Sequence, residues 1–85
     1  MQVETLGNNQ VVVITNEGKF FFSYDRLIAV RDWTGTLYLT SLWDYSATTL
    51  KYLKEAFKLG MTKSEIQKAL DNGEFQNYAE WKGDR

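Results

Sequence analysis

Short apolar runs separated by tight turns fill the first half of the chain. The runs are rich in β-branched and aromatic residues, which favour pleated strands, and the turns between them suit antiparallel neighbours. The sequence therefore predicts an antiparallel meander of four to five strands over residues 2–40, with the polar first run as an edge strand. The runs are QVETL (2–6), VVVIT (11–15), FFFSY (20–24), LIAVR (27–31) and TLYLT (36–40).

The hydrophobic period changes in the second half of the chain. From Leu50 onward, apolar and charged residues separate onto two faces of a 3.6-residue wheel. This pattern predicts a main amphipathic helix over residues 46–60, packed on one face of the sheet. Ser46 is the best N-cap and Asp44 the alternative, while Gly60 suits the position after the helix.

Two further segments complete the predicted single domain, residues 1–85. The run TKSE is a capping box, which predicts a second helix over 62–72 with Gly73 as its stop. The tail, 74–85, carries aromatic residues at intervals of three, typical of a short helical turn. It either docks on the core or binds a partner. Its aromatic residues are Phe75, Tyr78 and Trp81.

Composition bears on the stability of such a domain and on its location in the cell. A chain of 85 residues buries only about 60–65% of its unfolded surface, so the 5 Phe, 5 Tyr and 3 Trp must supply much of the core. Cysteine is absent, which fits a reducing cytoplasm. No signal peptide is visible, and the apolar runs are too short to span a bilayer. We expect a soluble intracellular protein without membrane contact.

Catalytic chemistry is poorly represented in this sequence. The hydroxyls of Ser46, Thr48 and Thr49 have no histidine to activate them, because the chain contains none. Metal-ligand spacing and a glycine-rich phosphate loop are also missing. We therefore expect no enzyme, no cofactor and no metal site. The acids weighed as a catalytic pair are Glu17, Asp25, Asp32 and Asp44, of which all but Asp44 fall in predicted turns.

Lysines form a candidate nucleic-acid surface. Lys51, Lys54 and Lys58 share one face of the predicted main helix, and Lys63 and Lys68 follow on the second helix. Because the net charge is −1 and arginine is scarce, a solvated helix face explains them better than phosphate contacts. Nucleic acid binding stays open but is not favoured.

Aromatic residues outside the predicted strands are candidates for protein contact. Trp33 falls in a predicted turn, Trp43 and Tyr45 in a loop before the main helix, and Trp81 in the tail. Trp and Tyr are enriched in binding hot spots, although small cores also use them to close their edges. Trp43 and Tyr45 suit a hydrophobic staple. The predicted partner-binding residues are Trp33, Phe75, Tyr78 and Trp81, with Lys51, Lys54 and Lys58.

One set of motifs resembles a known family. SYDRLIAVRD, then LYL, then WDYSATTLKYLKEAF, within residues 23–57, resemble small phage and prophage proteins of unknown function with the pattern S-Y-D-x-x-I-A and W-D-Y-S-x-T-T-x-K-Y-L. The resemblance implies a viral origin and a β-meander followed by a helix. It implies no catalytic residues. The pattern ends soon after the main helix, so residues 61–85 are expected to be an extension.

The functional hypothesis follows from the resemblance and from exclusion. We expect a non-catalytic phage accessory protein that binds a host protein in the host cell cytoplasm. An inhibitor of a host defence system, anti-CRISPR proteins included, is one concrete form. Two alternatives stay open: a nucleic-acid-binding phage regulator that uses the lysine face, and a self-assembling structural protein, for which a homodimer is the simplest case.

Overall fold

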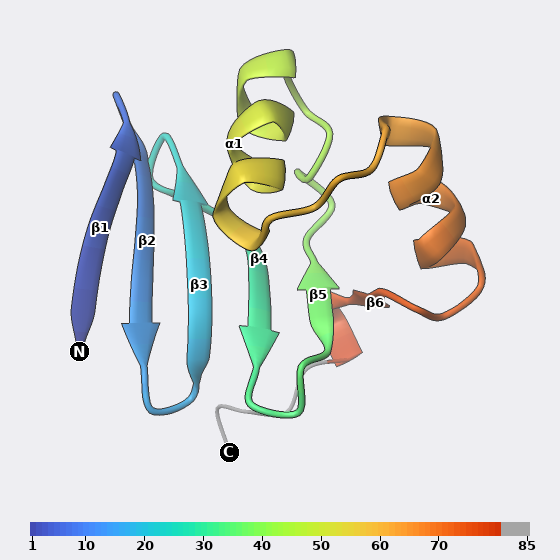
Figure 1. Ribbon diagram of the computed structural model, residues 1–85, viewed down its shortest axis with the longest axis horizontal. Helices are drawn as coiled ribbons and strands as arrows, with labels where there is room; N and C mark the ends of the chain where they lie inside the picture. Colours follow the sequence, from blue (N-terminus) through green and yellow to red (C-terminus); the bar gives the residue numbers. More distant parts are fainter. Residues whose placement is uncertain (81–85) are drawn as a thin grey trace.

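The structure, a computed structural model, describes residues 1–80. The fold is a six-stranded sheet with two α-helices, and a short 3-10 turn follows the last strand (Figure 1). The strands are β1 (Gln2–Gly7), β2 (Gln10–Thr15), β3 (Gly18–Ser23), β4 (Arg26–Asp32), β5 (Leu37–Leu39) and β6 (Gln76–Asn77). The helices are α1 (Ala47–Phe57), α2 (Lys63–Asp71) and the 3-10 turn η1 (Tyr78–Glu80).

The strand order in the sheet follows the order along the chain, with β1 at one edge. Every pair from β1 to β5 is antiparallel, which confirms the predicted meander and the α+β class. The sixth strand was not predicted. It pairs parallel with β5, and Phe75, whose N–H donates to the Ala69 carbonyl at 3.0 Å, turns the chain back toward the sheet.

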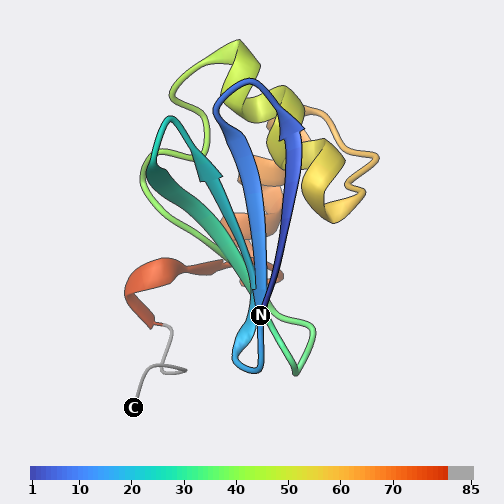
Figure 2. The same ribbon diagram turned by 90° about the vertical axis from the view of Figure 1, so that its left-hand side faces the viewer.

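Helix α1 covers one face of the sheet and closes the hydrophobic core. Val12 and Phe21 from the sheet meet Leu53 and Phe57 from α1, and all four are buried. Contacts of α1 reach β1, β2 and β3, whereas α2 lies beyond β5 (Figure 1). Figure 2 shows α1 on one side of the sheet and η1 on the other. The sheet therefore has one helix-covered face and one outer face.

The two ends of α1 show one confirmed and one wrong prediction. Ser46 is the N-cap, as its Oγ accepts the Thr49 N–H at 3.1 Å. The helix ends at Phe57, earlier than predicted, because Lys58 itself takes the left-handed conformation at φ 55°. The N–H of Leu59 then donates to the Lys54 carbonyl at 2.8 Å, a Schellman-type closure. Gly60 is not needed for this turn.

The loop before α1 is only partly the expected staple. Trp43 is buried in the core, but Tyr45 remains 54% exposed and does not pin the helix. The loop is joined to α2 by a 3.8 Å ion pair between Asp44 and Lys63. Such an exposed pair contributes little to stability.

Helix α2 forms as the capping box predicts. Thr62 Oγ1 accepts the Glu65 N–H at 3.2 Å, and Glu65 Oε1 accepts the Thr62 N–H at 2.8 Å. Ile66 and Ala69 are buried against the core, and Gly73 follows the helix at φ 85°. Across residues 1–80, neither helix has the length and apolar character needed to cross a bilayer.

Candidate functional site on the outer sheet face

The strand register places a set of mostly apolar side chains on the side away from α1. Val12 and Phe21 are opposite each other and face α1, so their neighbours along β2 and β3 point the other way. On that side Val13 lies opposite Phe20 and Val11 opposite Phe22. We name this surface the outer face. It comprises Val3, Thr5, Val11, Val13, Phe20, Phe22, Leu27, Val30 and Tyr38.

Exposure on the outer face rises toward the β1 edge. Val30 is fully buried, Val11 and Phe22 are half-buried, and Val3 is 57% exposed. At the opposite end η1, which begins at Tyr78, contacts β5, which contains Tyr38. Apart from η1, no helix or strand of residues 1–80 lies on this side of the sheet (Figure 2). Among residues 1–80, the outer face is therefore most open at the β1 edge, where Val3 is exposed.

Cations are segregated to the other side of the sheet. The outer face contains no lysine or arginine, whereas Lys19 and Arg31 form a cross-strand pair on the helix-covered side. Lys19 Nζ donates to the Ala56 carbonyl at 2.6 Å, and both cations lie within 5.5 Å of the Phe57 ring centroid. Their positive charge stabilises the C-terminal end of α1. The outer face therefore lacks the cationic side chains that contribute most to phosphate binding.

A hollow lies at the upper end of the outer face, where two strand turns meet. It has a volume of about 470 Å³ and is lined by Val11 and Phe22 from the face and by Asn9 and Asp25 from the turns. Its size is within the range of small-ligand and side-chain sites. The flat apolar surface therefore includes a recess into which a partner's side chain can insert.

A strained turn forms the rim of this hollow. Tyr24 and Asp25 join β3 to β4 with φ of 52° and 66°, values that glycine and asparagine tolerate far better than tyrosine. The Tyr24 N–H donates to the Asn9 carbonyl at 2.9 Å, and the Tyr24 side chain is 46% exposed. Backbone strain of this kind concentrates at binding sites. An exposed tyrosine on a strained turn is a candidate anchor.

Sequence reasoning missed Tyr24, because it assigned this residue to a strand. The available signal was the pair Tyr24 and Asp25 between two strands, a two-residue hairpin turn without glycine.

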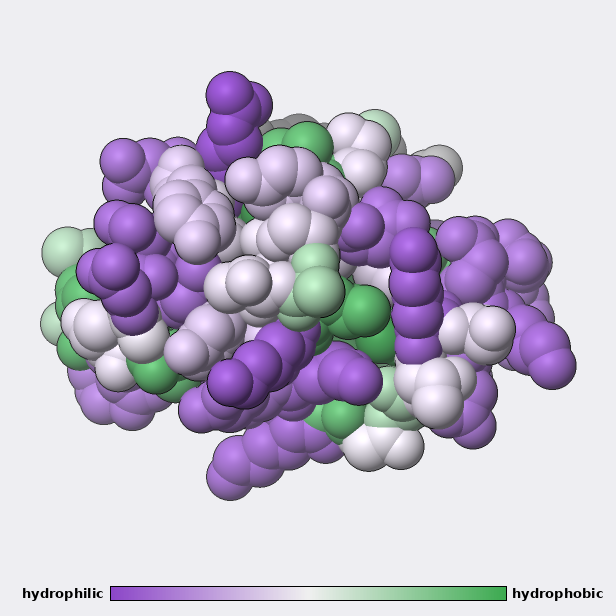
Figure 3. All heavy atoms as spheres, turned by 90° about the horizontal axis from the view of Figure 1, so that it is seen from above, coloured by the Kyte–Doolittle hydropathy of each residue, from purple (hydrophilic) through white to green (hydrophobic). Residues whose placement is uncertain are grey.

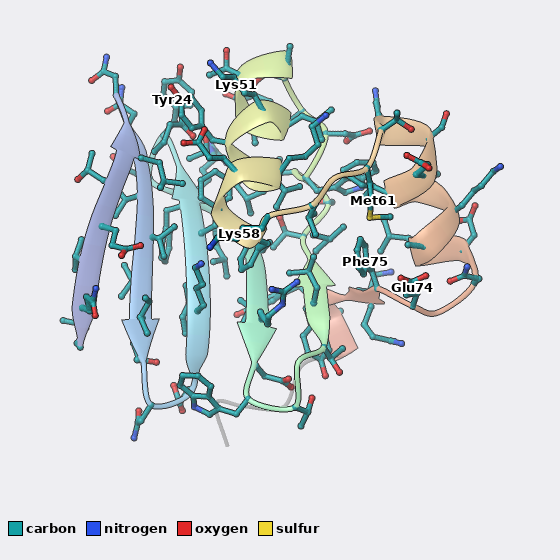
Figure 4. All side chains as sticks on the ribbon, viewed as in Figure 1. Tyr24, Lys51, Lys58, Met61, Glu74 and Phe75 are labelled. Atoms are coloured by element: carbon teal, nitrogen blue, oxygen red, sulfur yellow. The ribbon has the colours of Figure 1, made fainter. Side chains whose placement is uncertain are left out.

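Figure 4 shows Tyr24 at the same end of the molecule as Lys51. Seen from above in Figure 3, hydrophobic atoms there form only small patches among hydrophilic ones. This end of the molecule therefore has no large apolar surface among the atoms that Figure 3 shows.

Trp33, a candidate contact residue in a predicted turn, is exposed and lies at the opposite end of the strands from Tyr24. Its side chain is 66% exposed, and its indole N–H donates to the Asn16 carbonyl. Trp33 therefore ties the β4–β5 loop to the β2–β3 turn. This contact gives the side chain a structural role and leaves its ring exposed.

The predicted lysine face is not a single surface. Lys51 and Lys58 are exposed at opposite ends of α1, and Lys58 lies outside the helix (Figure 4). Lys54 is half-buried, and Lys51 Nζ lies 5.3 Å from the centroid of the Tyr52 ring. The helical wheel failed here because the helix ends one residue before Lys58.

Of the three aromatic residues predicted in the tail, the structure describes Phe75 and Tyr78. Phe75 is 8% exposed and belongs to the core cluster. Tyr78 is half-buried and makes contacts within the protein. Trp81 lies outside the described residues. Neither Phe75 nor Tyr78 is one of the outer-face residues defined above.

The hydroxyls weighed for catalysis serve the sheet-to-helix junction. Ser23 and Thr49 are fully buried with their hydroxyl oxygens 2.9 Å apart, and Ser46 Oγ lies 3.1 Å from Thr49 Oγ1. Thr48 is exposed on the first turn of α1. Across residues 1–80, no group of three or more His, Cys, Asp or Glu residues is placed to hold a metal ion. The arrangement of these hydroxyls is that of a cap and an interlayer contact.

The fold and the outer face define a small α+β protein with a single helical layer and one apolar sheet face that carries no cation. The chain belongs to a family of unknown function (DUF8033), which it matches over residues 1–73. The match includes α2, so this family does not end soon after α1, and only residues 74–85 lie beyond it. No curated protein and no solved structure matches the chain.

Proposed function

We propose that the protein is a non-catalytic binding protein that attaches to a partner protein through its outer face. The observation that carries the proposal is the apolar ladder in which Val11 faces Phe22 and Val13 faces Phe20. The solvent-facing side of a sheet normally carries polar residues. A continuous apolar patch on such a side marks an interaction site. A binding role therefore explains the composition of this face better than solvation does.

The chemistry of the surface specifies its partner. An outer face without lysine or arginine favours an apolar protein surface over a nucleic acid backbone. Tyr24 at the rim supplies an exposed aromatic group with a polar tip, a residue type enriched in binding hot spots. The partner is thus a protein that presents apolar side chains, one of which enters the hollow beside Phe22.

The setting of this interaction is the more specific part of the proposal. The motifs SYDRLIA and WDYSATTLKYL resemble phage and prophage proteins, which supports a viral accessory protein. In that setting the partner is a host protein in the host cytoplasm, and occupation of a host defence component is one form of the activity. The apolar outer face and the near-neutral net charge of −1 are consistent with such an inhibitor.

Site-specific photo-cross-linking in the host cell identifies the partner. A photoreactive phenylalanine analogue replaces Tyr24 at the rim of the hollow, and a matched chain carries it at the exposed Ser64 on α2. We expect one host protein to cross-link through position 24 and not through position 64. Equal products from both positions, or none from position 24, would contradict the proposed site.

Self-assembly is a second candidate, favoured by the free edge of β1. This strand lies at the edge of the sheet, and its first four residues are exposed, so its outward backbone groups are open to another strand. Analytical ultracentrifugation over a wide concentration range tests this alternative. A dimer that dissociates when Val3→Lys is introduced supports it, whereas a strict monomer removes it.

A further inference from the structure

A second hollow lies away from the outer face, between the end of β5, the loop that follows it, and α2 with β6. Its volume is about 330 Å³. Trp43 and Phe75, 7% and 8% exposed, form its aromatic part, and Asp71 with Gln67 and Gln76 forms much of its polar rim. Figure 4 shows Phe75 in the space between β5 and α2. No lysine or arginine of residues 1–80 lines it.

Three side chains of this hollow, Gln67, Asp71 and Gln76, offer hydrogen-bond acceptors. Gln67 Nε2 donates to Asp71 Oδ1 at 3.1 Å, and Gln76 Nε2 donates to the Gly73 carbonyl at 2.7 Å. Each of these bonds uses one of the two N–H groups of a glutamine amide, and Oε1 of both glutamines and Oδ2 of Asp71 remain as acceptors. A ligand with several hydrogen-bond donors can therefore be bound by these acceptors.

The electrostatics of the hollow favour a positive ligand. Asp71 is the last residue of α2, so its carboxylate lies at the negative end of the helix dipole, and the two fields add. Trp43 and Phe75 add aromatic rings, which attract cations through their faces. A planar guanidinium combines a positive charge, several donors and the ability to stack on an aromatic ring.

We infer that the hollow bounded by Trp43, Phe75 and Asp71 is a guanidinium-binding site. The cation comes either from an arginine side chain of a protein or from a free small molecule of the same chemistry. The site is separate from the outer face, so this inference does not depend on the proposed function.

Titration of the full chain by two-dimensional ¹H–¹⁵N NMR tests this site. Methylguanidinium is the probe and methylurea its neutral control of similar shape. We expect saturable shifts around Gln67, Asp71 and Gln76 with methylguanidinium alone. Equal shifts with methylurea, or shifts confined to other surfaces, would overturn the assignment.

Paired variants isolate the carboxylate. Asp71→Asn keeps the shape and should weaken methylguanidinium binding by about tenfold or more, because a charge-assisted acceptor is lost. Glu74→Gln removes a nearby exposed acid that does not line the hollow, and it should leave the affinity within about twofold. Equal affinity of Asp71→Asn and wild type would contradict the inference.

Two larger probes distinguish the sources of the cation. N-acetylarginine N-methylamide represents an arginine within a protein, and free arginine represents a small molecule. Tighter binding of the blocked residue assigns the site to a partner's side chain, and tighter binding of free arginine assigns it to a metabolite. Either result supports guanidinium recognition, whereas binding of neither probe overturns it.

Discussion

The hydroxyl of Ser23 on β3 lies 2.9 Å from the hydroxyl of Thr49 in the first turn of α1, and both residues are fully buried. The two hydroxyls join the sheet to the helix layer near the start of α1. A buried hydroxyl without a partner is costly, so each residue makes the other tolerable in the core.

Double-mutant analysis tests this contact. We expect Ser23→Ala and Thr49→Val each to lower the free energy of unfolding by about 1–2 kcal/mol, because the remaining buried hydroxyl loses a partner. The double variant should lose less than the sum of the two. Urea denaturation of the four proteins measures the coupling, and strict additivity would show that the contact carries no energy.

The N-cap of α1 gives a second prediction. Ser46→Ala should lower the free energy of unfolding by about 1 kcal/mol, because the Thr49 N–H loses its acceptor and Thr49 Oγ1 loses a neighbour. Ser41→Ala, at an exposed position outside the helix, is the control and should change stability by less than about 0.5 kcal/mol. An unchanged thermal melting curve for Ser46→Ala would reopen a functional role for its hydroxyl.

The left-handed residue at the end of α1 gives a stabilising substitution. Lys58→Gly should raise the free energy of unfolding by about 0.5–1 kcal/mol, since glycine adopts φ 55° without steric cost. Lys51→Gly, within the same helix, should lower it by about 1 kcal/mol. Chemical denaturation compares the pair. A loss of stability in both variants would mean that Lys58 stabilises the protein through its side chain.

A close backbone approach at Gly18 predicts a substitution that destabilises the protein. A Cβ at Gly18 would lie 2.5 Å from the Arg31 carbonyl oxygen, at φ 152°, so Gly18→Ala should cost at least about 1–2 kcal/mol. A Cβ at Gly60 would meet open space, with no neighbouring atom within 4 Å, so Gly60→Ala should be neutral within about 0.5 kcal/mol. Similar unfolding midpoints for the two variants would contradict the β3–β4 packing at this point.

Local patterns were sufficient to predict the meander and both helices. Runs such as VVVIT and FFFSY carry their strand preference in each residue, and Ser46, Thr62 and Glu65 carry the caps in their side-chain chemistry. These features depend on near neighbours in the chain. For that reason they can be predicted without tertiary information.

Features that depend on tertiary packing could not be predicted in the same way. The tail contains a short helical turn, η1, but β6 was not predicted, because its pairing with β5 and the burial of Phe75 depend on residues distant in the sequence. Lys58 rather than Gly60 closes α1 in the left-handed conformation, which the preference of glycine for this position did not predict. The side of the sheet that α1 covers decides which valines and phenylalanines lie on the outer face. The sequence does not specify that side, so their exposure could not be predicted.

The most direct test of the proposed binding role is the affinity of the purified, cross-linked partner for outer-face variants. Val3→Lys and Val13→Lys place a charge on this face, and Ser64→Lys on α2 is the control. Isothermal titration should show at least a roughly tenfold weaker Kd for both valine variants and an unchanged Kd for the control, because a desolvated charge opposes apolar contact. Unfolding curves confirm that each variant is folded. Wild-type affinity in folded Val3→Lys and Val13→Lys would contradict binding through the outer face.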